Sequence, residues 1–300
     1  MTQMLELTLS KISKMIPKRL WNAQKGDFGR LLCITGSRTM PGACALSTKA
    51  ALRSGAGLVT VGTAPENPMR LAGTLPEAMW LPLVTDADGF LLDVPNHESL
   101  EPHLRRANAV LLGCGMGVTP DTKALVKWIL HQAKCPVILD ADGLNCIADC
   151  IDIEGGKRTD WILTPHPGEM ARLTQKSISE IQAERIKTAQ DFAAKYPVTL
   201  VLKGAGTIVA QGKNVCMNPT GNPGMSRGGS GDVLAGMIAS LAAQGLSAWN
   251  AACAGVYLHG FAGDLAAARY SQQAMLPSDL LDCLPSAFIA MEQEQSPQFL

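Results

Sequence analysis

The sequence Asn218-Pro-Thr-Gly-Asn-Pro-Gly-Met-Ser-Arg-Gly-Gly-Ser-Gly-Asp-Val-Leu-Ala-Gly236 joins a loop to a helix. Its first half is rich in proline and glycine, which exclude a continuous helix or a central strand. From Val233 to Leu241 the apolar residues recur at helical spacing. The run Gly228-Gly-Ser-Gly231 lies between loop and helix, where backbone N–H groups and the helix dipole favour an anion. The stretch therefore predicts a phosphate-binding turn at the start of a helix.

Asp232 allows two interpretations at this helix start. Aspartate is a common N-terminal cap, and a cap needs no glycines around it. A catalytic base beside a bound phosphate accounts for both the carboxylate and the glycine cluster. We favour the catalytic interpretation, although Gly-Gly-Ser-Gly-Asp alone is a short motif and the rest of the chain must decide.

The composition excludes several classes of protein. The 300-residue chain is 47% hydrophobic and 17% charged, which is typical of folded domains and not of disordered chains. Its 26 basic and 26 acidic residues balance, which indicates neither nucleic acid nor a membrane as partner. No apolar run is long enough to cross a bilayer, and no signal-peptide core is present. The nine cysteines form no disulfide framework, so we expect reduced thiols in the cytoplasm.

Apolar runs of strand length alternate with helical patterns along the chain. The expected strands are 31–35, 58–61, 109–112, 137–139, 161–163 and 199–202, and 208–210 continues extended into a hairpin. Besides the helix after Asp232, the expected helices are 43–53, 119–132, 179–195, 248–269 and 277–291. This alternation predicts an α/β fold of three layers, α/β/α, with a mostly parallel central sheet and helices on both faces.

The domain organisation is simple. We predict an N-terminal leader helix over residues 1–24 and a single domain over 25–300, because no Pro-, Gly- or Ser-rich linker and no repeat divides the chain. Most of the predicted strands end in Gly, Asp, His or Lys. Because open α/β sheets bind ligands at the carboxyl ends of their strands, we expect the site there.

Two glycine-containing motifs follow predicted strands. Gly113-Cys-Gly-Met-Gly117 is similar to part of a dinucleotide fingerprint, but the spacing of its third glycine argues against a hydride-transferring Rossmann enzyme. It either lets the backbone approach a ligand or is a plain turn. Lys203-Gly-Ala-Gly-Thr207 places a lysine where it could contact a phosphate, and the alternative is again a turn.

Three polar side chains have the same placement at strand ends. His166 lies between two prolines that fix its position; it could hydrogen-bond a ligand, although a lone histidine is usually structural. Asp140 and Asp142 could hold Mg²⁺ through water or could cap the helix that follows them.

Seven motifs, taken in order, resemble the ADP-dependent NAD(P)H-hydrate dehydratase family. They are Lys25-Gly-Asp-Phe-Gly-Arg30, Pro41-Gly-Ala43, Ser54-Gly-Ala-Gly-Leu-Val59, Asp140-Ala-Asp-Gly-Leu-Asn145, Thr164-Pro-His-Pro-Gly-Glu169, Leu202-Lys-Gly-Ala-Gly-Thr207 and the run from Gly221 to Gly236. The resemblance covers about Lys25 to Leu284 and implies a ribokinase-like fold. Many relatives carry an epimerase domain in front; about twenty-four residues precede Lys25, so this chain resembles the stand-alone dehydratase.

The resemblance implies repair of nicotinamide cofactors to which water has added. ADP, or ATP in some relatives, phosphorylates the C6 hydroxyl of the S epimer of NADH hydrate or NADPH hydrate, with Mg²⁺ as cofactor. Loss of phosphate and of the C5 proton then gives NAD(P)H, phosphate and AMP (or ADP). The resemblance also implies a homo-oligomer, a tetramer, that acts beside a separate NAD(P)H-hydrate epimerase.

The resemblance also implies roles for residues. Asp232 is the general base. The hydrate contacts Ala43, Gly115, His166 and Asp232, with Gly117 as the alternative to Gly115. The adenine nucleotide contacts Lys203, Gly204, Ala205, Gly206, Thr207 and Gly231. The anion hole consists of Gly228, Gly229, Ser230 and Gly231, and no metal ligands are implied.

Two positions depart from the family pattern. Cys114 stands where relatives often have proline and could loosen its loop, and Arg227 stands where a small residue is common and could contact phosphate or narrow the nucleotide site. Two rival functions share part of this pattern. A vitamin-precursor kinase of the same fold shares the anion hole, but the Thr164–Glu169 motif argues against it. An inactive nucleotide-binding sensor is expected to have lost the base or to have a broken glycine cluster, and Asp232 and Gly228 to Gly231 are all present.

Overall fold

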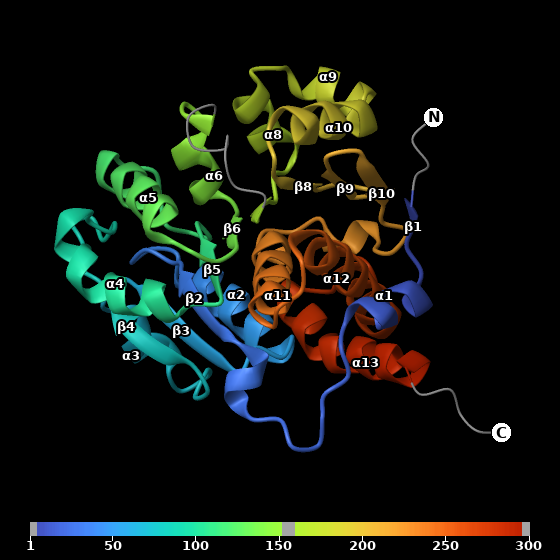
Figure 1. The fold of residues 1–300 in the computed structure, drawn as a ribbon, viewed down its shortest axis with the longest axis horizontal. Coiled ribbons are helices and arrows are strands. Elements are labelled where there is room, and N and C mark those ends of the chain that lie inside the picture. Colours follow the sequence, from blue (N-terminus) through green and yellow to red (C-terminus); the bar gives the residue numbers. More distant parts are fainter. Residues whose placement is uncertain (1–4, 152–159, 296–300) are drawn as a thin grey trace.

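The computed structural model describes residues 5–151 and 160–295. Within these residues a ten-stranded sheet forms the centre, in the order β1-β10-β9-β8-β7-β6-β5-β2-β3-β4 (Figure 1). The strands are β1 Leu5–Glu6, β2 Arg30–Ile34, β3 Leu58–Thr63, β4 Met79–Pro82, β5 Ala109–Leu112, β6 Val137–Leu139, β7 Trp161–Leu163, β8 Thr199–Leu202, β9 Ile208–Gln211 and β10 Asn214–Met217. Neighbouring strands run parallel except at β8–β9 and β9–β10, so the predicted mostly parallel sheet is confirmed.

Helices cover both faces of the sheet (Figure 1). One face carries α1 Leu9–Met15, α2 Pro41–Arg53, α11 Ser230–Ala243, α12 Ala248–Tyr270 and α13 Pro277–Gln295. The other carries α4 His97–Arg106, α5 Pro120–Gln132, α6 Asp142–Ile147, α8 Pro167–Thr174, α9 Ile178–Ala183 and α10 Arg185–Lys195. In β2, Leu31 and Cys33 belong to the first core and Leu32 and Ile34 to the second, because successive side chains of a strand point to opposite faces. The three predicted layers are therefore present.

Several elements differ from the sequence-based expectation. The short helix α3 Asn67–Leu71, strand β4 and helix α4 were not predicted, nor was α8. The helix expected over 179–195 is two helices, because Glu184 between α9 and α10 leaves the helical conformation at φ −133°, ψ 47°. Single-turn 3₁₀ helices occur at Lys25–Phe28, Val94–Asn96 and Pro223–Met225.

The helix in the N-terminal segment is shorter than expected. Helix α1 ends at Met15 because Ile16 precedes Pro17 and is extended, at φ −97° and ψ 118°; a residue before proline disfavours the helical region. Ahead of α1, Leu5 and Glu6 pair in parallel with β10, so this segment extends the sheet. The boundary of the main domain at residue 25 stays a prediction.

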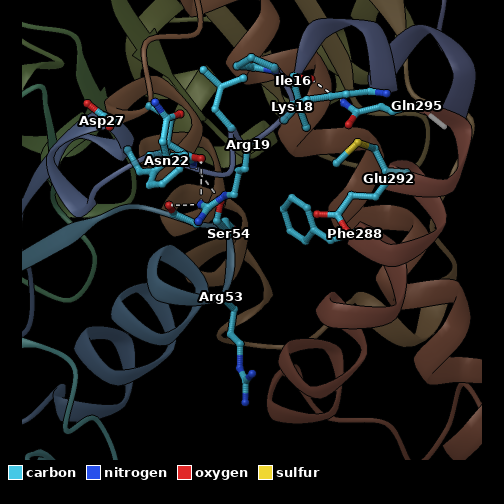
Figure 2. Close-up of a pocket in the computed structure, with 17 residues that line it drawn as sticks. Ile16, Lys18, Arg19, Asn22, Asp27, Arg53, Ser54, Phe288, Glu292 and Gln295 are labelled. Carbon is cyan, nitrogen blue, oxygen red and sulfur yellow. Dashed lines mark hydrogen bonds between the residues drawn. The ribbon is translucent and has the colours of Figure 1, made fainter.

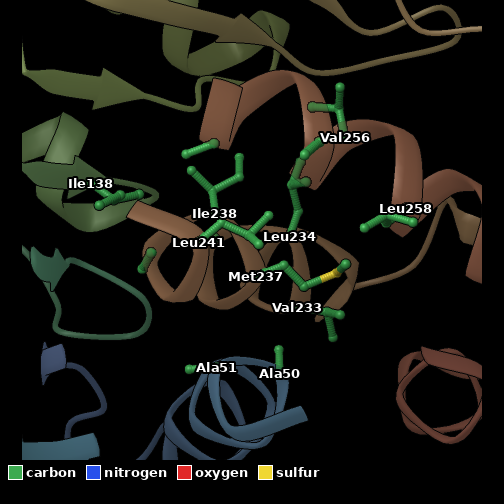
Figure 3. Packing of buried hydrophobic residues seen from close by; sticks show 14 of the residues in the cluster. Ala50, Ala51, Ile138, Val233, Leu234, Met237, Ile238, Leu241, Val256 and Leu258 are labelled. Atoms are coloured by element: carbon green, nitrogen blue, oxygen red, sulfur yellow. The ribbon is translucent and has the colours of Figure 1, made fainter. Parts of the chain in front are cut away.

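Helix α11 lies in the interior between α2 and α12, as Figure 3 shows. Gly236 permits the approach of α2, since a Cβ there would lie 2.1 Å from the Ser47 carbonyl oxygen. Gly255 permits the approach of α12, since a Cβ there would lie 2.5 Å from Ile238 Cγ1. Close packing on two sides fixes the direction of α11 and hence the place where its N-terminus meets the sheet edge.

Two large cavities lie at opposite ends of the strands. One, of about 670 Å³, lies near the amino ends; Figure 2 shows Arg19 and Ser54 on one side of it and Phe288 on the other. Arg19 donates a hydrogen bond of 2.6 Å to the Gly55 carbonyl there, and none of the predicted site residues lines this cavity. The second, of about 660 Å³, lies at the carboxyl ends. Within the described residues, no helix is both long and apolar enough to cross a membrane.

Candidate active site

The cavity at the carboxyl ends of the strands gathers most of the predicted site residues. It lies between the ends of β6, β7 and β8, the loop after β10, the start of α11 and one side of α12. Its lining includes His166, Lys203 to Thr207 and Gly228 to Asp232. These segments are far apart in the sequence, and parallel strand order brings them to one edge, as expected. Ala43 and Gly115 do not belong to the lining.

Asp232 does not cap α11. The N-cap residue is Gly229, with a left-handed φ of 102°, and α11 begins at Ser230. Asp232 is therefore the third residue of the helix, and the interpretation as an N-cap is wrong. The glycine cluster explains this, because Gly229 lets the chain enter the helix from a backbone conformation that other residues avoid.

The environment of Asp232 prepares it to accept a proton. Burial raises the pKa of its carboxyl, the nearby Asp140 carboxylate raises it further, and the result is a pKa of about 7. A hydrogen bond from Cys114 and the charge of Lys203 act in the opposite direction. A carboxylate with a pKa near the operating pH is well suited to general base catalysis.

Lys203 is held by two buried carboxylates. Its Nζ lies 2.6 Å from Asp140 Oδ1 and 3.7 Å from Glu169 Oε2, and Thr164 Oγ1 donates to the same Asp140 oxygen over 2.7 Å. Burial opposes the charged form of Lys203, but Asp140 and Glu169 outweigh it and raise the pKa of the ammonium group. A Cβ at Gly231 would lie 3.3 Å from Nζ. The charge of Lys203 therefore lies directly beside the run Gly228 to Gly231, called the glycine turn below.

The two aspartates after β6 have structural partners. Asp140 binds Lys203 and Thr164, and Asp142 Oδ2 accepts a hydrogen bond of 2.8 Å from the Gly117 backbone N–H. Neither side chain caps α6, whose N-cap residue Ala141 makes no side-chain hydrogen bond. The interpretation of these residues as helix caps is therefore wrong.

Within residues 5–151 and 160–295, the side chains around Asp232 do not offer the ligand set that Mg²⁺ prefers. Among the residues described, the potential ligand atoms of Cys114, Asp140 and Asp232 lie within 4.8 Å of one another. Mg²⁺ prefers oxygen ligands in near-octahedral geometry, and thiols suit softer metals. The ammonium group of Lys203 already neutralises Asp140. A magnesium ion in this cavity would therefore need the oxygens of a phosphate ligand.

His166 has a local structural role as well as its place in the cavity. It is the N-cap of α8: its Nδ1 accepts from the Gly168 N–H at 2.9 Å, and Glu169 Oε2 accepts the His166 N–H at 2.7 Å. Burial and then the charge of Lys203 lower the pKa of the imidazole. With Nδ1 acting as acceptor, the neutral ring carries its proton on Nε2.

The family of the chain follows from comparison with known proteins. The family model described as NAD(P)H-hydrate dehydratase matches residues 31–286. The chain belongs to the NAD(P)H-hydrate dehydratase family. It is 32% identical to the ADP/ATP-dependent NAD(P)H-hydrate dehydratase of Bacillus subtilis, co-crystallised with ATP and Mg²⁺; the match covers 95% of this chain and 97% of that one, with a TM-score of 0.78.

Two other relatives are similar to this chain over almost its whole length. A ribokinase-like superfamily protein of Enterococcus faecalis matches with a TM-score of 0.85 at 29% identity, over 97% of this chain and 96% of that one, which confirms the predicted ribokinase-like fold. The bifunctional NAD(P)H-hydrate repair enzyme of Moorella thermoacetica is 41% identical over 292 residues, 96% of this chain and 54% of that protein. The chain thus spans about half the length of the curated relatives it matches.

Two residues that the sequence did not indicate hold the segments that line the cavity. Arg185, on α10, donates to the carbonyl oxygens of Leu202, Lys203 and Gly206 over 3.2–3.4 Å and so holds the Lys203–Thr207 loop. His259, on α12, is buried and hydrogen-bonds through Nε2 to the Ser230 carbonyl over 3.0 Å. Burial lowers the pKa of His259 to about 4, so the ring is neutral and donates. Nothing in the sequence near either residue indicates these contacts.

The loop after β10 is also held from α12. Asn222 Nδ2 donates to Asp264 Oδ1 over 3.0 Å, and the Gly221 N–H donates to Asp264 Oδ2 over 2.9 Å. Asn218 Nδ2 donates to the Val256 carbonyl over 3.0 Å. Sequence reasoning missed Asp264, because an aspartate in a long helix resembles any solvated residue.

The structure also shows the surroundings of Ala43, Gly115 and Arg227. Ala43 and Gly115 lie against each other, since a Cβ at Gly115 would be 2.8 Å from Ala43 Cβ, and Gly115 needs its left-handed φ of 65°. Their contact with hydrate stays a prediction. The Arg227 guanidinium hydrogen-bonds to the Gln273 carbonyl at the rim of the cavity, so the group already has a partner.

Proposed function

We propose that this protein repairs nicotinamide cofactors by ADP- or ATP-dependent dehydration of the S epimer of NADH hydrate or NADPH hydrate. One observation carries the proposal: the Asp232 carboxylate, with a pKa of about 7, lines the same cavity as the glycine turn and Lys203. A general base beside a phosphate-binding turn is an arrangement that catalyses the phosphorylation of a hydroxyl group. Membership of the dehydratase family supports the choice of hydrate as that hydroxyl compound.

The first step is phosphoryl transfer. Asp232 takes the proton from the C6 hydroxyl of the hydrate, and the C6 oxygen attacks the terminal phosphorus of the nucleotide. The bond to the bridging oxygen breaks, so ADP leaves AMP and ATP leaves ADP. The backbone N–H groups from Gly228 to Gly231 and the Lys203 ammonium stabilise the charge on the transferring group. Arg185 and His259 keep these donors in position through the carbonyl contacts described above.

The second step is elimination. The phosphorylated oxygen leaves C6 with its bonding electrons as phosphate, which is a far better leaving group than hydroxide. The lone pair of the ring nitrogen assists, and the proton on C5 passes to the departing phosphate as the 5,6 double bond is restored. The products are NADH or NADPH, phosphate, and AMP or ADP.

Mg²⁺ belongs to the co-substrate in this proposal. The ion would enter bound to the nucleotide phosphates, which supply the oxygen ligands that the side chains do not. The B. subtilis relative was co-crystallised with ATP and Mg²⁺, which supports this assignment. Here it would neutralise phosphate charge.

Purified protein is expected to return chemically prepared NADH hydrate to NADH only when ADP or ATP and Mg²⁺ are present. The requirement follows because hydroxide cannot leave C6 without prior phosphorylation. The measurement is the recovery of the reduced-nicotinamide absorbance, with AMP and phosphate quantified in parallel. Equal rates without nucleotide would overturn the mechanism. A stable phosphorylated vitamin precursor as product would favour a kinase of the same fold.

Substitutions at His166 test its predicted contact with the hydrate. We expect His166→Asn and His166→Ala each to raise the KM for hydrate about 10-fold, while the KM for ADP stays nearly unchanged. Asparagine is a good N-cap and alanine is not, so only His166→Ala should lower the melting temperature. Steady-state kinetics and thermal melts of both variants measure this. A raised KM in the alanine variant alone would mean that His166 only shapes the loop.

The assembly and its partner are also proposals. We infer a cytoplasmic homo-oligomer, a tetramer, supplied with the S epimer by a separate epimerase. Leu20, Trp21 and Met69 are 69%, 97% and 92% exposed, and large exposed apolar side chains are common at interfaces. The sequence spacing of the nine cysteines shows no disulfide framework, which favours a reducing compartment. The curated relatives are named bifunctional, which supports a second activity nearby. A monomeric mass by light scattering would contradict the oligomer.

A further inference from the structure

The thiol of Cys114 lies between two carboxylates of the candidate active site. Cys114 follows β5 and is fully buried. Its Sγ lies 3.7 Å from Asp140 Oδ2, and one ligand atom from each of Cys114, Asp140 and Asp232 falls within 4.8 Å of the others. The thiol is therefore a neighbour of the candidate base itself.

The loop that carries Cys114 is held at both ends. Gly36 and Ser37 donate their backbone N–H groups to the carbonyl oxygens of Cys114 and Gly115, over 2.8 and 2.7 Å. Asp142 binds the far end of the loop, as described above. That Cys114 loosens this loop stays a prediction, and the backbone contacts themselves do not depend on its side chain. They fix the thiol where it is.

The thiol is a hydrogen-bond donor in this position. Burial raises the pKa of Cys114 well above its ordinary value, and the charges of Asp232 and Asp140 raise it further. The neutral S–H group has one proton to give, and ionised carboxylates only accept. Asp140 Oδ1 already accepts from Lys203 and Thr164, which leaves Oδ2 toward the thiol.

Four elements contribute charged or titratable groups around Asp232. Asp140 follows β6, Asp142 begins α6, Lys203 follows β8 and Cys114 follows β5. The two aspartates oppose a negative charge on Asp232, whereas Lys203 and Cys114 favour it. Lys203 is already engaged by Asp140 and Glu169. Cys114 is thus a neutral donor placed between two like charges.

We propose that Cys114 is a positioning residue for the general base, whose thiol lies beside the carboxylates of Asp140 and Asp232 and shares its one proton between them as a hydrogen-bond donor. The donor keeps Asp232 ionised and directed toward the substrate hydroxyl. The inference rests on the proposed role of Asp232 and adds a residue that acts through it.

The pH dependence of kcat tests this role. Cys114→Ala removes the donor, so the acidic limb of the profile should move up by about one pH unit, the effect of one hydrogen bond to a charged group. The rate should therefore fall several-fold below about pH 7 and return to the wild-type plateau above about pH 9. Cys114→Ser keeps a donor and should retain the wild-type limb. The KM for ADP should not move in either variant.

Controls separate this role from a loss of packing. Cys33→Ala is the matched variant, because Cys33 is equally buried and lies on β2 outside the cluster of Cys114, Asp140 and Asp232; its profile should equal that of the wild type. Should Cys114→Ala fail to fold, Cys114→Val fills the space without a donor and takes its place. An unshifted limb in the donor-free variant, or a rate lowered equally at every pH, would overturn the proposal. An Asp232→Asn enzyme that stays active would instead overturn the proposed base.

Discussion

Asp232→Asn is expected to lower kcat for hydrate dehydration by at least roughly 10²-fold, because it removes the proton acceptor and keeps the shape of the side chain. The helix start should survive, since Gly229 and not Asp232 is the N-cap of α11. Affinity for ADP should hold or rise slightly, because a negative charge beside the phosphates is gone. Steady-state kinetics with both substrates measures these effects, and Asp88→Asn, an exposed loop position, is the control. An Asp232→Asn enzyme within a few-fold of wild type would contradict the role of base.

The same variant should be more stable than the wild type at alkaline pH. The folded pKa of Asp232, about 7, lies above the ordinary value of 3.8, so the unfolded chain releases this proton first. The side chain therefore contributes stability at low pH that is lost as the pH rises from about 4 to about 7. Asparagine does not ionise and avoids that loss. We expect a melting temperature raised by a few degrees at about pH 8 and unchanged at about pH 4; a constant difference would contradict the raised pKa.

Lys203→Met is expected to have a comparable effect on activity and a larger effect on folding. The variant leaves Asp140 and Glu169 buried without their cation, and breaking a buried pair costs about 3–5 kcal/mol. It also removes the ammonium group beside the glycine turn. The rate should fall by roughly 10²- to 10³-fold, as for loss of one preorganised charge-stabilising donor, and the KM for ADP should rise about 10-fold.

A second substitution separates the two effects of Lys203→Met. In the Lys203→Met/Asp140→Asn double variant the main buried charge is removed with its partner, so most of the stability should return. Activity should stay low, because no cation faces the phosphates. Denaturant unfolding and kinetics of the single and double variants measure this. Full recovery of activity in the double variant would show that Lys203 acts only as a structural partner of Asp140.

The central strands and the edge that carries the site were determined by the sequence itself. The expected strands 109–112, 137–139 and 161–163 coincide with β5, β6 and β7. Both faces of these strands are covered, so each is a continuous apolar run, and the residue that follows, Gly113, Asp140 or Thr164, marks its end. Because parallel strands share one carboxyl edge, the placement of Lys203 and Asp232 around one cavity also followed from the sequence.

The tertiary structure alone decided which polar groups contact each other and in which protonation state. Asp140 and Asp142 are two residues apart, yet one pairs with Lys203, 63 positions later, and the other binds Gly117. Periodicity reports which side chains are buried but not what lies across from them. The carboxylate of Asp232 could be recognised as a candidate, but its pKa near 7 depends on burial and on Asp140.

The same limit explains the supporting residues and the helix start. Arg185 and His259 act through main-chain carbonyl groups, and such contacts leave no pattern in the sequence. Helix α11 begins at Ser230, whereas the apolar spacing began at Val233. The left-handed conformation of Gly229 ends the loop at that earlier position. The position of Cys114 between two carboxylates exists only because β5, β6 and α11 meet at one edge. Local sequence sets the elements, whereas the site depends on distances between elements that only packing fixes.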